Sequence, residues 1–217
     1  MSTPRGCAIL LHGLGRTPRS LRRVAAALRQ AGYRVVNPGY PSTSRPIERL
    51  AAEVVAPALA ACGGVAPVHF VTHSLGGILV REYFQSHRPV PGSRVVMLSP
   101  PNQGSEVADR MRRFLPVRWI LGPALAQLGT GPDGVVARLR PVDLDIGVIT
   151  GDRSLDPWFG PLFDGPHDGK VSVARARLPE MRDFLVVPRS HSFIMADREV
   201  IRQVLHFLAH GRFALPG

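Results

Sequence analysis

Ser74 stands where a strand, a sharp turn and a helix are predicted to meet. The β-branched and aromatic run at 68–71 favours a strand, and an apolar stretch of helical period follows the segment Thr72-His73-Ser74-Leu75-Gly76-Gly77. A serine at such a turn projects its hydroxyl above the sheet, where it can act as a nucleophile. The usual pattern has a glycine two residues before and two residues after the serine, but Thr72 takes the first of these places. By itself the segment therefore fits a nucleophile and a simple helix cap about equally well.

A nucleophilic serine needs a base that accepts its proton and a carboxylate that orients the base. His191 follows the last predicted strand, and a histidine can take the serine proton and return it to a leaving alcohol. Two aspartates remain open as the acid. Asp168 is favoured, because Gly169 allows a tight turn and 171–173 can anchor that turn against the sheet, whereas Asp152 directly follows a predicted strand. The chain order Ser, Asp, His is far more specific than the serine segment alone.

Strands and helices that could position these groups are predicted to alternate along the chain. We expect strands at 7–11, 33–36, 68–71, 94–98, 145–150 and 184–187, with helices from Pro18, from about Pro46, from Gly76 to about His87 and from about Asp197 to His210. This rhythm requires parallel strands joined by crossover helices. We therefore predict one domain over 1–217, a doubly wound and mostly parallel α/β sheet with helices on both faces. Reactive groups in such a sheet gather at the carboxyl ends of the strands, where all three candidates fall.

Five segments make the chain resemble the α/β-hydrolases, closest to their lipase and esterase branch. They are His12-Gly13-Leu14, the segment 72–77, Pro101-Asn102-Gln103-Gly104-Ser105, Asp168-Gly169-Lys170-Val171 and His191. The resemblance covers 7–213 and implies a compact version of the fold without its first two antiparallel strands. It also implies ester hydrolysis without metal or organic cofactor, with Ser74 as nucleophile, His191 as base and Asp168 as acid. The oxyanion hole would then be formed by the backbone N–H groups of Leu14 and Leu75.

The segment 104–140 is too long for an ordinary connection and is rich in apolar side chains interleaved with arginines. We expect a short helical cap over Ser74 that supplies an apolar acyl pocket with a basic rim. The side chains expected to contact substrate are His12, His73, Asn102, Phe114 and Trp119. His12 is also expected to support the oxyanion loop.

Composition limits the partners of the protein. Its 217 residues are 45% hydrophobic and carry a formal net charge of +11, almost wholly from arginine, since Lys170 is the only lysine. The arginines are scattered rather than clustered, which argues against nucleic acid and leaves contact with an anionic membrane possible. The apolar run near the N-terminus is too short for the hydrophobic region of a signal peptide. Cys7 and Cys62 are not expected to form a disulfide framework, so the cytoplasm is the expected compartment.

The function predicted from these features is hydrolysis of small carboxylic esters, possibly lipids, that carry a hydrophobic acyl group. One alternative keeps the same three residues but acts on thioesters or transfers the acyl group to another acceptor. A second alternative is a catalytically silent binding protein with the same fold, which the retention of all three residues disfavours.

Overall fold

The sheet in the computed structural model, which describes residues 4–215, has six strands that are all parallel, in the order β2-β1-β3-β4-β5-β6. The side chains of Leu115, Val117 and Arg118 also lie outside the description. The strands are β1 (Cys7–Leu11), β2 (Arg34–Val36), β3 (Val68–His73), β4 (Arg94–Leu98), β5 (Asp145–Gly151) and β6 (Asp183–Val187). The predicted alternation of strands and helices is confirmed, and no antiparallel strand precedes β1 among the described residues.

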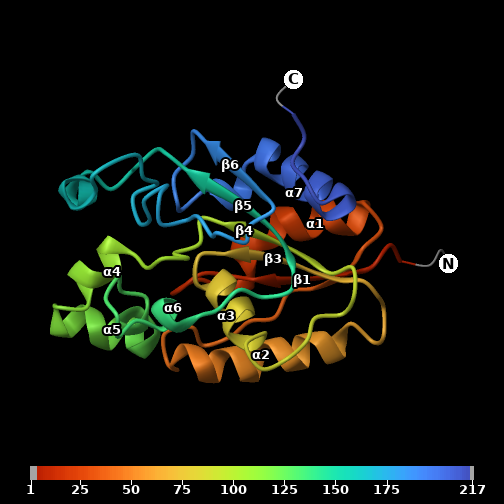
Figure 1. Ribbon diagram of the computed structural model, residues 1–217, viewed down its shortest axis with the longest axis horizontal. Helices are drawn as coiled ribbons and strands as arrows, with labels where there is room; N and C mark the ends of the chain where they lie inside the picture. Colours follow the sequence, from red (N-terminus) through yellow and green to blue (C-terminus); the bar gives the residue numbers. More distant parts are fainter. Residues whose placement is uncertain (1–3, 216–217) are drawn as a thin grey trace.

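Two layers of helices cover the two faces of this sheet (Figure 1). Helices α1 (Arg22–Gln30) and α7 (Arg198–His210) share one face, while α2 (Ile47–Ala61) and α3 (Leu75–Tyr83) share the other. In β1, Ala8 and Leu10 pack toward α1 and α7, whereas Cys7, Ile9 and Leu11 pack toward α2 and α3. Alternate residues of a strand point to opposite faces, so a strand covered on both sides must be apolar throughout. The run Cys7–Leu11 meets that requirement, since all five residues are fully buried.

Two helix boundaries differ from the sequence-based expectation. The segment from Pro18 begins as a 3₁₀ turn, η1 (Pro18–Leu21), and becomes α-helical only at Arg22. Helix α3 ends at Tyr83 rather than near His87. At this end the Tyr83 carbonyl oxygen accepts hydrogen bonds from the Ser86 N–H at 3.4 Å and from Nδ1 of His87 at 2.9 Å, so the terminal carbonyl is satisfied by a turn and a side chain.

The two cysteines are bonded to each other, so the expectation that they do not pair is wrong. Cys7 on β1 and Cys62 at the end of α2 form a disulfide with 5.8 Å between their Cα atoms, although 55 residues separate them in the chain. Helix α2 packs on the face of the sheet toward which Cys7 points, and this brings the two residues together. The prediction of a reducing compartment loses its support, because disulfides persist mainly in oxidising environments. Among residues 4–215, no helix is long and apolar enough to cross a membrane.

The segment 104–140 is helical, as expected, and lies at one end of the molecule (Figure 1). It forms α4 (Glu106–Met111), α5 (Leu115–Gln127) and α6 (Val135–Arg138). Ser105 begins α4, since its hydroxyl accepts a hydrogen bond from the Ala108 N–H at 3.1 Å. Helix α5 breaks at Gly122, where φ is 72°.

Candidate active site

Ser74 occupies the sharp turn between β3 and α3 in a conformation that is rare for a residue other than glycine. Its φ is 50° and its ψ is −119°, and its N–H donates to the Leu98 carbonyl at 2.9 Å. The turn depends on Gly76, because a Cβ at that position would lie 2.4 Å from the Leu11 carbonyl oxygen. The serine is therefore held at the carboxyl end of β3 by close packing of α3 against β1.

Thr72 stands where a glycine is usual in this turn. It fits there because Gly77, which has no side chain, leaves room for it. Thr72 is fully buried and pairs with Leu11 and Met97 in the neighbouring strands. A Cβ at Gly77 would lie 3.3 Å from the Thr72 hydroxyl oxygen, which is tighter than an ordinary contact. The second glycine of the Gly76-Gly77 pair thus accommodates the threonine, and the turn keeps its shape.

His191 and Asp168 form a tightly held pair at the ends of β6 and β5. The Nδ1 of His191 lies 2.8 Å from Oδ2 of Asp168, and the other oxygen, Oδ1, accepts the N–H groups of Lys170 and Val171, both at 2.9 Å. The His191 N–H also donates to the Asp168 carbonyl at 2.9 Å. Asp152, the alternative acid, instead faces the Arg153 guanidinium at 3.6 Å. The geometry therefore brings His191 to Asp168 and not to Asp152.

Electrostatics at this pair favour an ionised carboxylate. Burial opposes the charge of Asp168, but His191 and the Val171 N–H outweigh it and hold the pKa of the carboxyl below its usual value. A carboxylate accepts the Nδ1–H of the imidazole, which leaves Nε2 of His191 as the acceptor. This is the tautomer that a base for serine requires.

His73 packs directly against His191, with 4.8 Å between the ring centroids. Complete burial, followed by the neighbouring His191 and Arg16, lowers the pKa of His73 well below its usual value. Its Nε2 lies 3.0 Å from the His191 carbonyl oxygen and donates to it, because a carbonyl can only accept. His73 is thus a neutral side chain that fixes the backbone of His191 and also lines the pocket.

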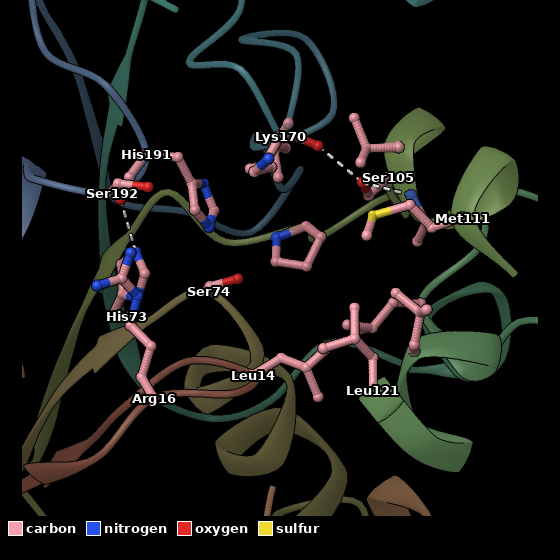
Figure 2. A pocket seen from close by; sticks show the side chains of 16 residues that line it. Leu14, Arg16, His73, Ser74, Ser105, Met111, Leu121, Lys170, His191 and Ser192 are labelled. Carbon is pink, nitrogen blue, oxygen red and sulfur yellow. Dashed lines mark hydrogen bonds between the residues drawn. The ribbon is translucent and has the colours of Figure 1, made fainter. Parts of the chain in front are cut away.

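Ser74 and His191 line the same pocket, of about 180 Å³. In Figure 2 the Ser74 hydroxyl and the His191 ring lie on facing sides of an open space. One wall comes from the helices of the 104–140 segment. Its members are Val107, Ala108, Met111, Leu121, Leu125 and Leu128. The expected apolar wall from this segment is therefore present, but the cations that line the pocket are Arg16 and Lys170 rather than arginines of the segment.

The loop after β1 reaches the nucleophile from the side of Leu14. Gly13 packs so closely that a Cβ on it would lie 3.3 Å from the Cβ of Ser74. Among the described residues the Leu14 N–H has no acceptor, and Leu75, as the first residue of α3, has an N–H with no partner within its helix. Leu14 lines the same pocket as Ser74, and Leu75 follows Ser74 directly in the chain.

His12 lies behind this loop and does not line the pocket. It is fully buried, its ring stacks on Tyr40 with 3.9 Å between centroids, and its Nδ1 donates to the Gly13 carbonyl at 2.9 Å. The Tyr40 hydroxyl donates to the His12 carbonyl. The expected support of the loop fits this arrangement, whereas the expected contact of the His12 side chain with substrate does not.

Three further residues expected at the substrate lie away from the pocket. Asn102 is buried and donates to the Ala176 carbonyl at 2.8 Å, so it braces the loop after β4. Phe114 shares a separate surface groove with Trp158, and Trp119 is 83% exposed. Sequence patterns located the segment that carries the two aromatic residues but not the direction in which their side chains point.

Sequence reasoning missed Arg16 as a lining residue. It belongs to no motif, and the only available signal was its place two residues after Leu14 in the loop that follows β1. Within the described chain, no group of three or more His, Cys, Asp or Glu side chains gathers closely enough to hold a metal ion.

Comparison with known proteins agrees with this architecture. Residues 9–129, more than half of the chain, match the family model described as alpha/beta hydrolase fold. Comparison with curated proteins found no match.

Solved structures with the same fold include a lipase from Bacillus licheniformis, BlEst2. Its propeptide form has a TM-score of 0.69 at 18% identity, covering 98% of this chain and 52% of that one, so this chain spans about half of its length. The mature form has a TM-score of 0.67 at 19% identity, with coverages of 96% and 91%. The metagenomic carboxyl esterase MGS0156 has a TM-score of 0.65 at 19% identity, with coverages of 89% and 67%. At these identities the likeness establishes the fold alone.

Proposed function

The chain belongs to the alpha/beta hydrolase fold family, and from this premise we propose that it is a serine carboxylic-ester hydrolase that acts through an acyl-enzyme. The observation that carries the proposal is the buried pair of His191 and Asp168, 2.8 Å apart, whose imidazole faces the same pocket as Ser74. Solved structures with this fold include proteins named as a lipase and a carboxyl esterase, which supports the choice of an ester.

In the proposed reaction, the Ser74 hydroxyl oxygen attacks the ester carbonyl carbon while Nε2 of His191 takes the hydroxyl proton. Asp168 stabilises the imidazolium that forms. The negative charge on the carbonyl oxygen is held by the N–H groups of Leu14 and Leu75. The C–O bond then breaks, His191 gives its proton to the leaving alcohol, and an acyl-Ser74 ester remains. Water, activated by His191, releases the acid in the same manner.

The acyl group is proposed to lie along the wall formed by α4 and α5. That wall is apolar, and its burial of a hydrocarbon chain would contribute about 0.8 kcal/mol per CH₂. A pocket of about 180 Å³ is smaller than the roughly 300–1,000 Å³ usual for drug-sized ligands. Short to medium acyl chains therefore suit it better than long ones.

Hydrolysis of p-nitrophenyl esters from acetate to palmitate tests the proposal, with wild type and Ser74→Ala assayed side by side. We expect wild-type turnover with an optimum at short to medium chains, and a loss of turnover to background in Ser74→Ala. The variant should keep its far-UV circular dichroism spectrum, because truncating a partly exposed serine at a turn removes little packing. A folded wild type that hydrolyses none of the esters would contradict the proposal and favour a binding protein.

A further inference from the structure

Arg16 is a cation without a counterion in the wall of the pocket. Its side chain is half-buried and lines the pocket together with Ser74 and His191. Among the described residues, no carboxylate lies within salt-bridge distance of its guanidinium, and no other acceptor forms a hydrogen bond with it. Burial lowers the pKa of Arg16, and no neighbouring acid acts in the other direction. An arginine nevertheless keeps its charge, so this desolvation is left uncompensated.

The other cation of the pocket is already paired. Lys170 lies 2.9 Å from an Asp156 carboxylate oxygen, and its Nζ stands 4.4 Å from the centroid of the Phe159 ring. No Asp or Glu is among the described residues that line the pocket. Of the described lining residues, Arg16 is therefore the one whose charge remains available to a ligand.

Arg16 lies on the side of the nucleophile that faces away from the apolar wall. In Figure 2, Arg16, His73 and Ser192 gather on one side of Ser74, whereas Met111 and Leu121 lie on the other. If the acyl chain follows the apolar wall, the alcohol portion of the ester must extend toward the opposite side. His191 packs against His73, with 4.8 Å between the ring centroids, so the group that protonates the leaving alcohol borders that side.

We propose that the alcohol portion of the natural ester carries an anionic group, a phosphate or a carboxylate, that pairs with the Arg16 guanidinium. This inference rests on the proposed ester hydrolysis and specifies its substrate class. The planar guanidinium can give two parallel N–H···O bonds to either oxyanion, and such charge-assisted bonds are among the stronger ones in proteins. The Ser192 hydroxyl, which also lines this side, can add a further donor.

Three butanoyl esters with a common acyl chain test the inference, because only the alcohol differs. They are 1-butanoylglycerol, 1-butanoylglycerol 3-phosphate and the butanoyl ester of 4-hydroxybutanoate, assayed by pH-stat release of butanoic acid. The quantity compared is kcat/KM for each anionic ester divided by kcat/KM for the neutral one. We expect wild type to prefer at least one anionic ester by about tenfold or more. Which anion is preferred distinguishes a phosphate from a carboxylate ligand.

Two variants and one matched control connect that preference to the side chain. Arg16→Gln should lower the ratio about tenfold, and Arg16→Lys should retain part of it. Arg19→Gln removes the same charge from an exposed position nearby that does not line the pocket, and it should keep the wild-type ratio.

Equal use of the three esters by wild type, or an unchanged ratio in Arg16→Gln, would overturn the inference while ester hydrolysis stands. Hydrolysis of p-nitrophenyl esters but of none of these three by folded wild type would also overturn the inference alone, whereas hydrolysis of neither set would overturn the proposed function, and the substrate class with it.

Discussion

At the scale of single residues, the candidate site depends on the full set of hydrogen bonds that the Asp168 carboxylate accepts. Asp168 receives three hydrogen bonds through its two oxygens, from His191, Lys170 and Val171, although the residue is only 1% exposed. Among the described residues Asp152 receives no comparable set, and its ion-pair partner is the adjacent Arg153, at 3.6 Å. A buried charge that is this well paired can hold the imidazole in one tautomer.

Substituting the two aspartates separately tests this difference. Asp168→Asn should lower kcat by about 10³- to 10⁴-fold, because an amide can donate to Nδ1 and would favour the wrong tautomer. Asp152→Asn serves as the control and should stay within about twofold of wild type. Steady-state kinetics on the best p-nitrophenyl ester gives both values. The reverse ranking would move the acid to Asp152.

The three residues of the candidate site could be predicted because their positions follow from topology. Ser74, Asp168 and His191 each come after a strand, and parallel strands bring their carboxyl ends to one edge. The pocket walls could not be predicted in the same way. Whether Trp119 faces the pocket or solvent depends on the rotation of α5. Arg16 becomes a candidate ligand-binding residue only because it lines the pocket and pairs with no carboxylate among residues 4–215.

At the scale of elements, the turn between β3 and α3 requires the helix to begin almost in contact with β1. The backbone of Gly76 lies against the Leu11 carbonyl, which leaves no space for a side chain. This packing fixes the direction of α3, and with it the position of Ser74.

A methyl group at this contact should separate the elements. Gly76→Ala would place its Cβ 2.4 Å from a backbone oxygen, and we expect a loss of about 3 kcal/mol in the free energy of unfolding. Gly160→Ala is the matched control, because nothing lies within 4 Å of its added Cβ, and it should change stability by less than about 0.5 kcal/mol. Urea unfolding measures both. A Gly76→Ala protein as stable as the control would show that the close contact does not exist.

The order of strands and helices was predictable from hydrophobic periodicity, whereas the disulfide was not. Cys7 and Cys62 belong to different elements, and their proximity depends on the position at which α2 packs on the sheet. A spacing of 55 residues in the sequence carries no sign of that contact.

The disulfide should contribute measurably to stability. Closing a loop of 55 residues restricts the unfolded chain by an amount worth about 4 kcal/mol in the chain-entropy treatment. We expect the melting temperature of wild type, measured by calorimetry, to fall when a phosphine reductant is added. The double variant Cys7→Ala with Cys62→Ala should melt at one temperature with or without reductant. A wild type that is indifferent to reductant would mean that the bond does not form.

At the scale of the whole molecule, several histidines are folded into the interior in their neutral form. Burial, aided by the charge of Arg94, lowers the pKa of His69 from 6.5 to about 4, and burial also lowers the pKa of His12 and His73. A histidine with a lower pKa in the folded state binds its proton more weakly there than in the unfolded chain. Its contribution to stability is therefore complete above pH 6.5 and is lost as the pH falls toward 4.

The free energy of unfolding should accordingly decrease between pH 6.5 and 4, with about 3 kcal/mol of the decrease due to His69. His69→Asn should flatten this dependence, because an amide does not titrate between pH 6.5 and 4. The fold should be kept, since the amide oxygen can still accept the Arg94 N–H that Nδ1 accepts at 3.1 Å. His210→Asn, at an exposed position, should leave the dependence as in wild type. Urea unfolding at several pH values measures the slopes. Equal slopes in wild type and His69→Asn would contradict the assignment.

Large apolar side chains are exposed on and beside α5: Trp119 lies in the helix, and Phe114 and Trp158 share one surface groove. Because of these exposed side chains and the net charge of +11, we still predict contact with an anionic lipid surface. Cosedimentation should detect binding to phosphatidylglycerol vesicles and little to phosphatidylcholine vesicles, and equal binding to both would refute a role for charge.

The most direct test of the central claim is covalent labelling of Ser74. A fluorophosphonate reacts far faster with a serine that a neighbouring base activates than with other side chains, and the label can be read by intact mass and located by peptide mapping. We predict one label per chain, on Ser74, with none in Ser74→Ala and a strongly slowed reaction in His191→Ala. An unlabelled, folded wild type, or a label on another serine, would contradict the claim that Ser74 is the nucleophile.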